Sequence, residues 1–279
     1  MRTRVTGILR LLGLQAAARR IYRNGAGYIR DSVWRFSPRS VKEDNCLPVP
    51  PPSLCFLAAD SYNPLHFLSS GRKGAVTVRR LLQSAGRPLV GFRSVLDFGC
   101  GCGRIARHMR DYLEGISFIG TDIDPVQVRW VRGKMPPFDF TLTGPSAALP
   151  FPDGNFDLVL AVAVFPWLDE TAQLKWMEEL GRVLEPGGVL LVTLKGENRR
   201  GELSEEQLEA FDSGCPVVIE PGSSGTRYCL SYNPESYVRH VLADGFDVLF
   251  FSPGGSEDTN QDAWVLTRSC GEAAGTESI

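Results

Sequence analysis

Short apolar runs alternate with amphipathic stretches from Val95 onward. The run 158–165 is continuously apolar, which is typical of a parallel strand buried on both faces. The stretch from about 171 to 184 instead spaces its apolar residues as a helix does, and these are Leu174, Trp176, Met177, Leu180 and Val183. Further strands are expected at 95–98, 118–122, 189–194, 246–251 and 263–267, and further helices at 61–84, 203–211 and 234–243. This alternation predicts an α/β protein with a mostly parallel sheet.

Three glycines at alternate positions directly follow the first of these strands. Residues 95–105 read Val-Leu-Asp-Phe-Gly-Cys-Gly-Cys-Gly-Arg-Ile, so Asp97 precedes Gly99, Gly101 and Gly103. Glycine takes positive φ readily and lets a ligand lie against bare backbone, and the N–H groups that open a helix have no partner within it. Arg104 stands where a dinucleotide fingerprint needs its third glycine. The turn therefore indicates a nucleotide site that is not built for NAD.

A second strand ends in acidic residues 25 positions after Asp97. The sequence Phe-Ile-Gly-Thr-Asp-Ile-Asp-Pro at 118–125 contains Asp122 and Asp124. A carboxylate only accepts hydrogen bonds, so it can take both hydroxyls of a ribose, and a βαβ unit presents such an acid roughly 20 residues after the turn. Asp124 precedes a proline, which is typical of a helix N-cap. Asp122 is thus the better candidate for the ribose, with Asp124 as the alternative.

The pattern Asp97-x-Gly99-x-Gly101-x-Gly103 resembles the first motif of the class I S-adenosylmethionine-dependent methyltransferases. The resemblance continues in order and spacing through Leu-Pro-Phe-Pro-Asp-Gly-Asn-Phe-Asp at 149–157 to Arg-Val-Leu-Glu-Pro-Gly-Gly at 182–188. It implies a Rossmann-like, doubly wound, seven-stranded and mostly parallel sheet with an N-terminal helical extension, and S-adenosyl-L-methionine as cofactor. The cofactor residues that it implies are Asp97, Gly99, Cys100, Gly101, Gly103, Asp122, Ile123, Ser146 and Ala147. Smaller motifs, such as Gly-Arg-Lys at 71–73, are similar to a bacterial branch of type 11/25-like small-molecule methyltransferases.

Two positions depart from the family's pattern. Many members place an acid after the third strand to accept the adenine amino group, and this chain has Pro145 there. We therefore expect backbone groups around Ser146 and Ala147, or another side chain, to recognise adenine. Relatives also often carry a histidine base after the fourth strand, where this chain has Trp167. The surrounding sequence, Val-Phe-Pro-Trp-Leu at 164–168, is not the Asn/Asp-Pro-Pro-aromatic motif of enzymes that methylate amide or base nitrogens. This argues against such acceptors.

Charge is distributed unevenly along the chain. Residues 1–40 hold nine Arg and a single acid, a charge of +8, so the remainder carries about −10 of the net −2. A nucleic-acid groove on the domain is disfavoured, because binding phosphates needs a basic face. The N-terminal segment mixes Arg with Leu and Ile as a basic amphipathic helix does, and such a helix could lie on an anionic membrane. A mitochondrial transit peptide and a packed helix or partly ordered tail are the alternatives.

The sequence suggests four segments and no metal centre. They are a basic amphipathic extension (1–45), a Pro-rich linker with a helical cap (46–92), the methyltransferase domain (93–269) and a disordered tail (270–279). The seven cysteines form no Cys-x-x-Cys pair and are odd in number, which favours a reduced, cytoplasmic protein. The three histidines are scattered, so no metal site is indicated.

Methyl transfer is an in-line displacement, so an enzyme mainly aligns the acceptor, and a hydroxyl acceptor additionally needs proton removal. Side chains expected near the methyl end are His66, Tyr228, Tyr232 and Asp262, with a packing or surface role as the alternative for each. The function favoured is methyl transfer to a small-molecule acceptor, with oxygen ahead of nitrogen. The alternatives are methylation of protein or RNA, and a non-catalytic cofactor-binding partner protein.

Overall fold

The computed structural model describes residues 29–36, 43–44 and 47–269. The chain divides into two compact units, Met1–Ser69 and Ser70–Ile279. The basic extension and the C-terminal tail expected from the sequence lie mostly or wholly outside the described residues, so both stay predictions.

The first unit consists of short elements with defined starts. Helix α4 (Pro52–Ala59) begins at a proline, whose fixed φ suits a first turn and whose missing N–H is not needed there. Asp31 accepts the N–H of Ser53 in that turn, with 2.9 Å between Oδ1 and nitrogen, and so satisfies one of the helix's unpaired donors. The other described elements are helical residues 29–34, the antiparallel pair β1 (Glu43–Asp44) and β2 (Leu47–Pro48), and the start of α5 (Pro64–Ser84).

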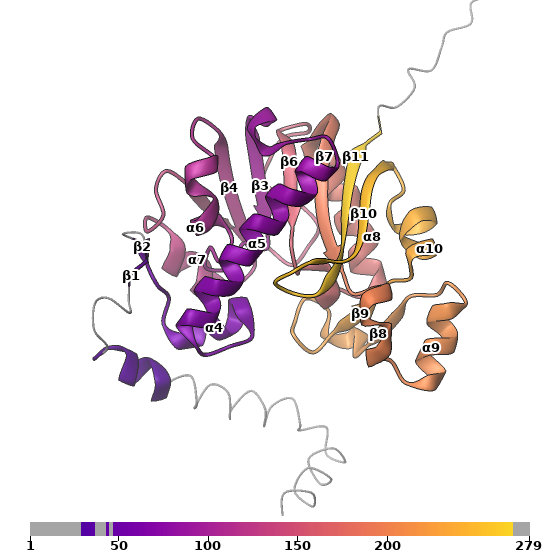
Figure 1. Ribbon diagram of the computed structural model, residues 1–279, viewed down its shortest axis with the longest axis horizontal. Coiled ribbons are helices and arrows are strands. Elements are labelled where there is room, and N and C mark those ends of the chain that lie inside the picture. The colour runs from indigo at the N-terminus through magenta and orange to yellow at the C-terminus, as the bar shows by residue number, and fades with distance from the viewer. Residues whose placement is uncertain (1–28, 37–42, 45–46, 270–279) are drawn as a thin grey trace, which may run out of the picture. The chain divides into compact units, whose positions relative to one another are not determined.

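The second unit is built on a seven-stranded sheet, as the sequence predicts (Figure 1). Its strands are β3 (Ser94–Phe98), β4 (Ser117–Asp122), β5 (Asp139–Leu142), β6 (Phe156–Ala161), β7 (Leu184–Leu194), β10 (Phe246–Ser256) and β11 (Gln261–Arg268). The order across the sheet is β10-β11-β7-β6-β3-β4-β5. Neighbours from β5 to β7 run parallel, and β11 runs antiparallel to both β7 and β10.

The central strand β6 explains why its sequence shows no alternation. All six of its residues are buried, and Val159 and Ala161 belong to the core under helix α8 (Glu170–Val183). Leu158 and Leu160 are equally buried although their side chains point to the opposite face of the sheet. Burial of both faces is what a continuous apolar run requires in a parallel sheet.

The strand order reverses direction at β3. From β3 the chain proceeds to β4 and β5 on one side, and then crosses to β6 and β7 on the other. Loops that leave the carboxyl ends of β3 and β6 therefore diverge, and open α/β sheets bind their ligands at such a reversal of strand order. The glycine-rich turn follows β3 directly, so the topology places it at this point.

Helix α8 matches its predicted range and differs in one core residue. Trp176, Met177, Leu180 and Val183 are buried in the main core, as predicted. Leu174 is instead 38% exposed, so its place on the apolar face was predicted wrongly. Gln173 occupies the buried side, where its amide donates to the carbonyl oxygen of Phe165 at 2.9 Å.

The strand expected at 158–165 ends early, at Ala161. Ala163 takes a positive φ of 60°, and its N–H donates to Oγ1 of Thr193 at 2.8 Å. The chain then forms the 3₁₀ turn η3 (Phe165–Trp167), in which Trp167 donates its indole N–H to the carbonyl oxygen of Ala163 at 2.8 Å. These two hydrogen bonds, one to the Thr193 side chain and one within the turn, replace strand pairing after Ala161. The apolar pattern of the sequence does not reveal this change.

The C-terminal part contains the remaining predicted elements and one unforeseen pair. Helix α9 (Glu205–Asp212) carries a capping box between Ser204 and Gln207. The helix expected at 234–243 is split into α10 (Glu235–Tyr237) and the π-helical η6 (Val238–Leu242). The Gly/Ser-rich insertion forms an antiparallel pair, β8 (Val217–Ile219) with β9 (Leu230–Tyr232). Across the described residues, every helix is too short or too polar to cross a bilayer.

Candidate functional site

The three alternate glycines form a left-handed turn that other residues would not adopt easily. Gly99, Gly101 and Gly103 have φ of 76°, 58° and 77°. A Cβ atom on Gly99 would also clash with Cγ2 of Val164, which belongs to the loop after β6. The turn therefore needs glycine for its backbone conformation, and at Gly99 for space as well.

The turn is held against the end of β4 by backbone hydrogen bonds. The N–H groups of Gly99 and Cys100 donate to the carbonyl oxygen of Thr121 at 2.7 and 2.9 Å. The N–H of Gly101 donates to Oδ2 of Asp122 at 2.8 Å, and the N–H of Asp124 donates to Oδ1 at 2.8 Å. Asp122 thus contributes to the shape of the turn. A carboxylate has about four acceptor sites, so Asp122 can still accept a further donor, such as a hydroxyl.

Asp124 has the capping role that the sequence suggested. Its Oδ1 accepts the N–H groups of Val126 and Gln127 at 2.8 and 3.2 Å, at the start of α7 (Pro125–Val131). Pro125 occupies the first helical position. The Asp124 carboxylate therefore serves as the cap of α7, and Asp124 stays the alternative to Asp122 as a ligand carboxylate.

Asp97 is a buried carboxyl group beside the turn. Burial raises its pKa to about 7, the nearby charge of Arg104 lowers it, and the charge of Asp122 raises it. Near neutral pH this carboxyl group is therefore poised between its two protonation states. A cation placed beside it would favour the ionised form.

The two cysteines of the turn are buried, and Cys100 is not an activated nucleophile. Cys100 and Cys102 both lie in the interior. Burial, reinforced by the negative charges of Asp97 and Asp122, raises the pKa of the Cys100 thiol well above its usual value, so the thiolate is disfavoured. Among the described residues no cluster of His, Cys, Asp or Glu is placed to hold a metal ion.

The loop after β5 lies beside Asp122. The parallel register pairs Asp122 with Leu142, and the N–H of Thr143 donates to the Asp122 carbonyl oxygen at 3.0 Å. Ser146 is exposed and Ala147 is partly exposed on the same loop. The predicted cofactor residues therefore come from three adjacent strand ends, β3, β4 and β5.

Two of the predicted catalytic residues are engaged in structural networks. The hydroxyl of Tyr232 donates to Oε2 of Glu202 at 2.8 Å and lies 3.2 Å from Nζ of Lys195. Burial, together with the Glu202 carboxylate, raises the pKa of Tyr232 strongly. Asp262 is buried and accepts the N–H groups of Gly254 and Asn198 at 2.8 and 3.3 Å. Burial raises the pKa of Asp262 as well.

The other two predicted catalytic residues lie in different units. Tyr228 is partly exposed in the second unit, and its N–H donates to Oγ1 of Thr226 at 3.3 Å. His66 is exposed in the first turn of α5, within the first unit. The structure gives neither of them a defined place beside the glycine-rich turn.

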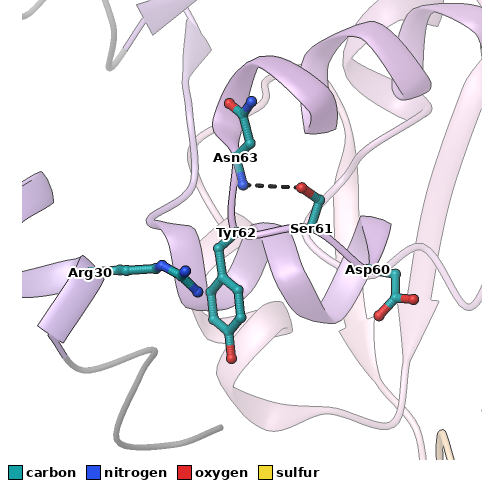
Figure 2. A pocket seen from close by; sticks show the side chains of 5 residues that line it. All are labelled: Arg30, Asp60, Ser61, Tyr62 and Asn63. Carbon is teal, nitrogen blue, oxygen red and sulfur yellow. Dashed lines mark hydrogen bonds between the residues drawn. The ribbon is translucent and has the colours of Figure 1, made fainter.

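The first unit has an open polar pocket of its own. It is lined by Arg30, Asp60, Ser61, Tyr62 and Asn63 (Figure 2). Figure 2 shows Arg30 reaching toward the ring of Tyr62, and its Cζ lies 4.2 Å from the ring centroid. Tyr62 also stacks on Phe56, with 4.4 Å between centroids. This arrangement packs Tyr62 in place and holds no catalytic cluster.

A segment that sequence reasoning left unplaced crosses the carboxyl edge of the sheet. The N–H of Gly225 donates to the carbonyl oxygen of Trp167 at 2.7 Å. A Cβ on Gly225 would lie 3.9 Å from Cδ1 of Ile123, which follows β4. Arg227 lies over the Trp167 ring, with 5.8 Å from Cζ to the centroid. The Gly/Ser content of 213–232 signalled a loop, but only the fold shows which strand ends it joins.

The chain is similar in sequence to known methyltransferases. The family model described as "Methyltransferase domain" matches residues 96–192. A 2-methyl-6-phytyl-1,4-hydroquinone methyltransferase of Synechocystis is 40% identical over 103 residues, which cover 36% of this chain and 31% of that protein. A fatty-acid O-methyltransferase of Mycolicibacterium smegmatis is 26% identical over 197 residues, 69% of this chain and 64% of that protein. A crystal structure of a SAM-dependent methyltransferase from Methanosarcina mazei has a TM-score of 0.46 at 21% identity, covering 63% of this chain and 92% of that one.

The fold and the glycine-rich turn are those of a class I S-adenosylmethionine-dependent methyltransferase domain, and residues 96–192 match the methyltransferase family model. S-adenosyl-L-methionine is the cofactor of this domain. The residues present fit it, because Gly99, Gly101 and Gly103 give the turn a left-handed backbone, and Asp97 and Asp122 flank it. The chain spans less than two thirds of each of the two curated relatives described above.

Proposed function

We propose that this protein transfers a methyl group from S-adenosylmethionine to an oxygen of a small-molecule acceptor. The observation that carries the proposal is the left-handed turn at Gly99, Gly101 and Gly103, whose middle N–H is fixed by Asp122. In this proposal Asp122 also takes the ribose hydroxyls with its remaining lone pairs. Asp97 receives the ammonium group at the other end of the cofactor.

The cofactor supplies an electrophilic methyl group when it is bound. The chain's own residues then have to orient the acceptor and exclude water. The loop after β6 packs on the turn through Val164 and Gly99, which favours Trp167 as a wall of the acceptor site. Gly225 and Arg227 cover that tryptophan from the insertion.

Within oxygen acceptors, a carboxylate is favoured over a hydroxyl. A hydroxyl must lose a proton to a base, whereas a carboxylate is already ionised at neutral pH. Tyr232 and Asp262, two of the predicted bases, are occupied by hydrogen bonds within the protein. Arg227 beside Trp167 would complement a carboxylate, and a fatty-acid O-methyltransferase is among the relatives.

An acceptor screen with methyl-labelled cofactor tests this proposal. The panel contains fatty acids, di- and tricarboxylates, phenols, amines, a protein extract and RNA. We expect label in small carboxylic acids, and we expect mild base to release it as methanol, because methyl esters hydrolyse and ethers do not. Base-stable label on phenols would keep the methyltransferase proposal and reject the carboxylate. Label on protein or RNA alone would reject a small-molecule acceptor.

Peripheral contact with an anionic membrane through residues 1–45 is a separate proposal, as is a cytoplasmic location. It is supported by the +8 charge of residues 1–40. Full-length protein should co-sediment with anionic liposomes at low salt and be released at high salt, because salt screens the attraction. Protein lacking residues 1–40 should stay in the supernatant. Equal behaviour of the two proteins would reject the membrane proposal.

A further inference from the structure

A buried ion pair joins the glycine-rich turn to the connection between β10 and β11. Nη1 of Arg104, the residue after Gly103, lies 2.6 Å from Oδ2 of Asp258. The side chains of Arg104 and Asp258 are 9% and 0% exposed. A pair this well removed from water is costly to assemble, and removing one partner leaves an uncompensated charge. Its position beside the turn therefore calls for a function.

The connection between β10 and β11 is folded so that it presents Asp258. The hydroxyl of Ser256 donates to Oδ1 of Asp258 at 2.9 Å, and the hydroxyl of Thr259 donates to that of Ser256 at 2.8 Å. Arg80 of α5 donates to the carbonyl oxygen of Gly255 at 2.7 Å. These bonds fix the carboxylate from both sides, and they join the connection to α5 (Figure 1).

Helix α5 leaves space for the pair through two glycines one turn apart. A Cβ on Gly71 would clash with the backbone oxygen of Arg104. A Cβ on Gly74 would lie 3.1 Å from Oδ2 of Asp258 and 3.0 Å from Cδ1 of Ile105. The helix backbone therefore approaches both ends of the ion pair. This contact gives a physical reason for glycine at positions 71 and 74.

The Arg104 side of the pair acts on Asp97 through charge. The charged and titratable groups that face Asp97 are Arg104 from the turn, Asp122 from the end of β4 and the Cys100 thiol. Arg104 is the cation among them, so it is the group that favours an ionised Asp97. Asp258 balances the charge of Arg104 and holds its guanidinium in a fixed position relative to Asp97.

We propose that Asp258 is a positioning residue of the cofactor site, which fixes and balances Arg104 and thereby sets the pH range in which Asp97 accepts the cofactor's ammonium group. The proposal rests on the cofactor-binding function proposed above. It predicts that removing the charge of one partner shifts the pH midpoint of cofactor binding in the direction opposite to removing the charge of the other. Losing the Arg104 charge makes Asp97 harder to ionise, whereas losing the Asp258 charge leaves Arg104 unbalanced and makes Asp97 easier to ionise.

The experiment measures the affinity of the full-length protein for S-adenosylhomocysteine by calorimetry from about pH 5.5 to 8 and takes the midpoint of its pH dependence. Asp258→Asn should move the midpoint down, and Arg104→Gln should move it up, each by about 0.5 unit or more. The neutral double variant Arg104→Gln/Asp258→Asn avoids an unpaired buried charge and should also lie above wild type. Glu257→Gln is the matched control, because Glu257 is 54% exposed in the same connection, and its midpoint should stay unchanged.

The carboxyl carbon of Asp97, followed by NMR in the ligand-free protein and assigned with Asp97→Asn, should titrate with the same order of midpoints. Shifts of one sign for both single variants, or unmoved midpoints in variants that circular dichroism shows to be folded, would overturn the positioning role. If Asp258→Asn does not fold, the double variant decides by whether its midpoint lies above that of wild type. A wild-type protein that binds no S-adenosylhomocysteine would instead overturn the proposed function.

Discussion

Oδ2 of Asp122 accepts the N–H of Gly101 at 2.8 Å, so the residue expected to bind ribose also shapes the turn that is proposed to hold the rest of the cofactor. The other oxygen, Oδ1, accepts the N–H of Asp124, which is the N-cap of α7. A single carboxylate thus couples the end of β4 to the glycine-rich turn. Substitutions at this position should therefore affect both the ligand and the loop.

Asp122→Ala should weaken binding of S-adenosylhomocysteine by about 1.5 to 3 kcal/mol, the range for hydrogen bonds to a charged group. Asp124→Ala is the matched control in the same loop, because its carboxylate caps α7. It should lower the free energy of unfolding by about 1 kcal/mol with little change in affinity. Calorimetry and thermal unfolding of both variants give the comparison. Exchanged effects would assign the ribose to Asp124.

Cofactor affinity should rise with pH through the neutral range. The pKa of Asp97 is raised to about 7 by burial, and an adjacent ammonium group lowers it, so binding below that pH releases a proton. Affinity should increase by up to about tenfold per pH unit below pH 7 and level off above it. In the ligand-free protein the sign is opposite, because a raised carboxyl pKa contributes stability that is lost as pH rises through about 7. Asp97→Asn should flatten both curves, and a pH-dependent affinity that survives it would exclude Asp97 as the titrating group.

Gly99→Ala should abolish measurable cofactor binding and destabilise the fold. The alanine would combine a φ of 76° with a clash against Val164. Gly86→Ala controls for backbone strain alone, because Gly86 has a φ of 71° and open space around its Cα. The control should lose about 1 kcal/mol of stability and keep its affinity. Wild-type affinity in folded Gly99→Ala would show that the turn does not touch the cofactor.

Tyr232→Phe should retain methyl transfer within about threefold. Its hydroxyl is hydrogen-bonded to Glu202, and a strongly raised pKa makes it a poor base near neutral pH. The variant leaves the ion pair between Lys195 and Glu202, at 2.7 Å, in place. A steady-state assay with the acceptor found in the screen would decide. A loss of about a hundredfold or more in kcat, with unchanged KM, would give Tyr232 a catalytic role.

The strands and the glycine-rich turn could be predicted because their signals are local. Glycines that need positive φ, an acid before proline, and an apolar run buried on both faces are each visible in a few consecutive residues. The early end of β6 was not visible, because it depends on the hydroxyl of Thr193 from a different strand. The predicted buried face of α8 was wrong at one residue for the same reason. Gln173 is buried because it forms hydrogen bonds with the distant Asn233 as well as with Phe165.

The residues of the candidate site also fall into those with a local sequence signal and those without one. Residues of the cofactor turn and of the next strand end follow one another in sequence, so a motif could point to them. Pairings such as Arg104 with Asp258, or Tyr232 with Glu202 and Lys195, join residues 30 or more positions apart, and only the fold brings them together. Choosing catalytic side chains by residue type therefore selected Tyr232 and Asp262, which the fold uses for its own hydrogen bonds.

Calorimetric titration of the purified full-length protein with S-adenosylhomocysteine and, separately, with NAD tests the central claim most directly. The three glycines at alternate positions, with Arg104 in place of a dinucleotide glycine, predict binding of S-adenosylhomocysteine at least about tenfold tighter than binding of NAD. Tighter binding of NAD, or no heat from S-adenosylhomocysteine with folded protein at any pH between about 6 and 8, would contradict the account.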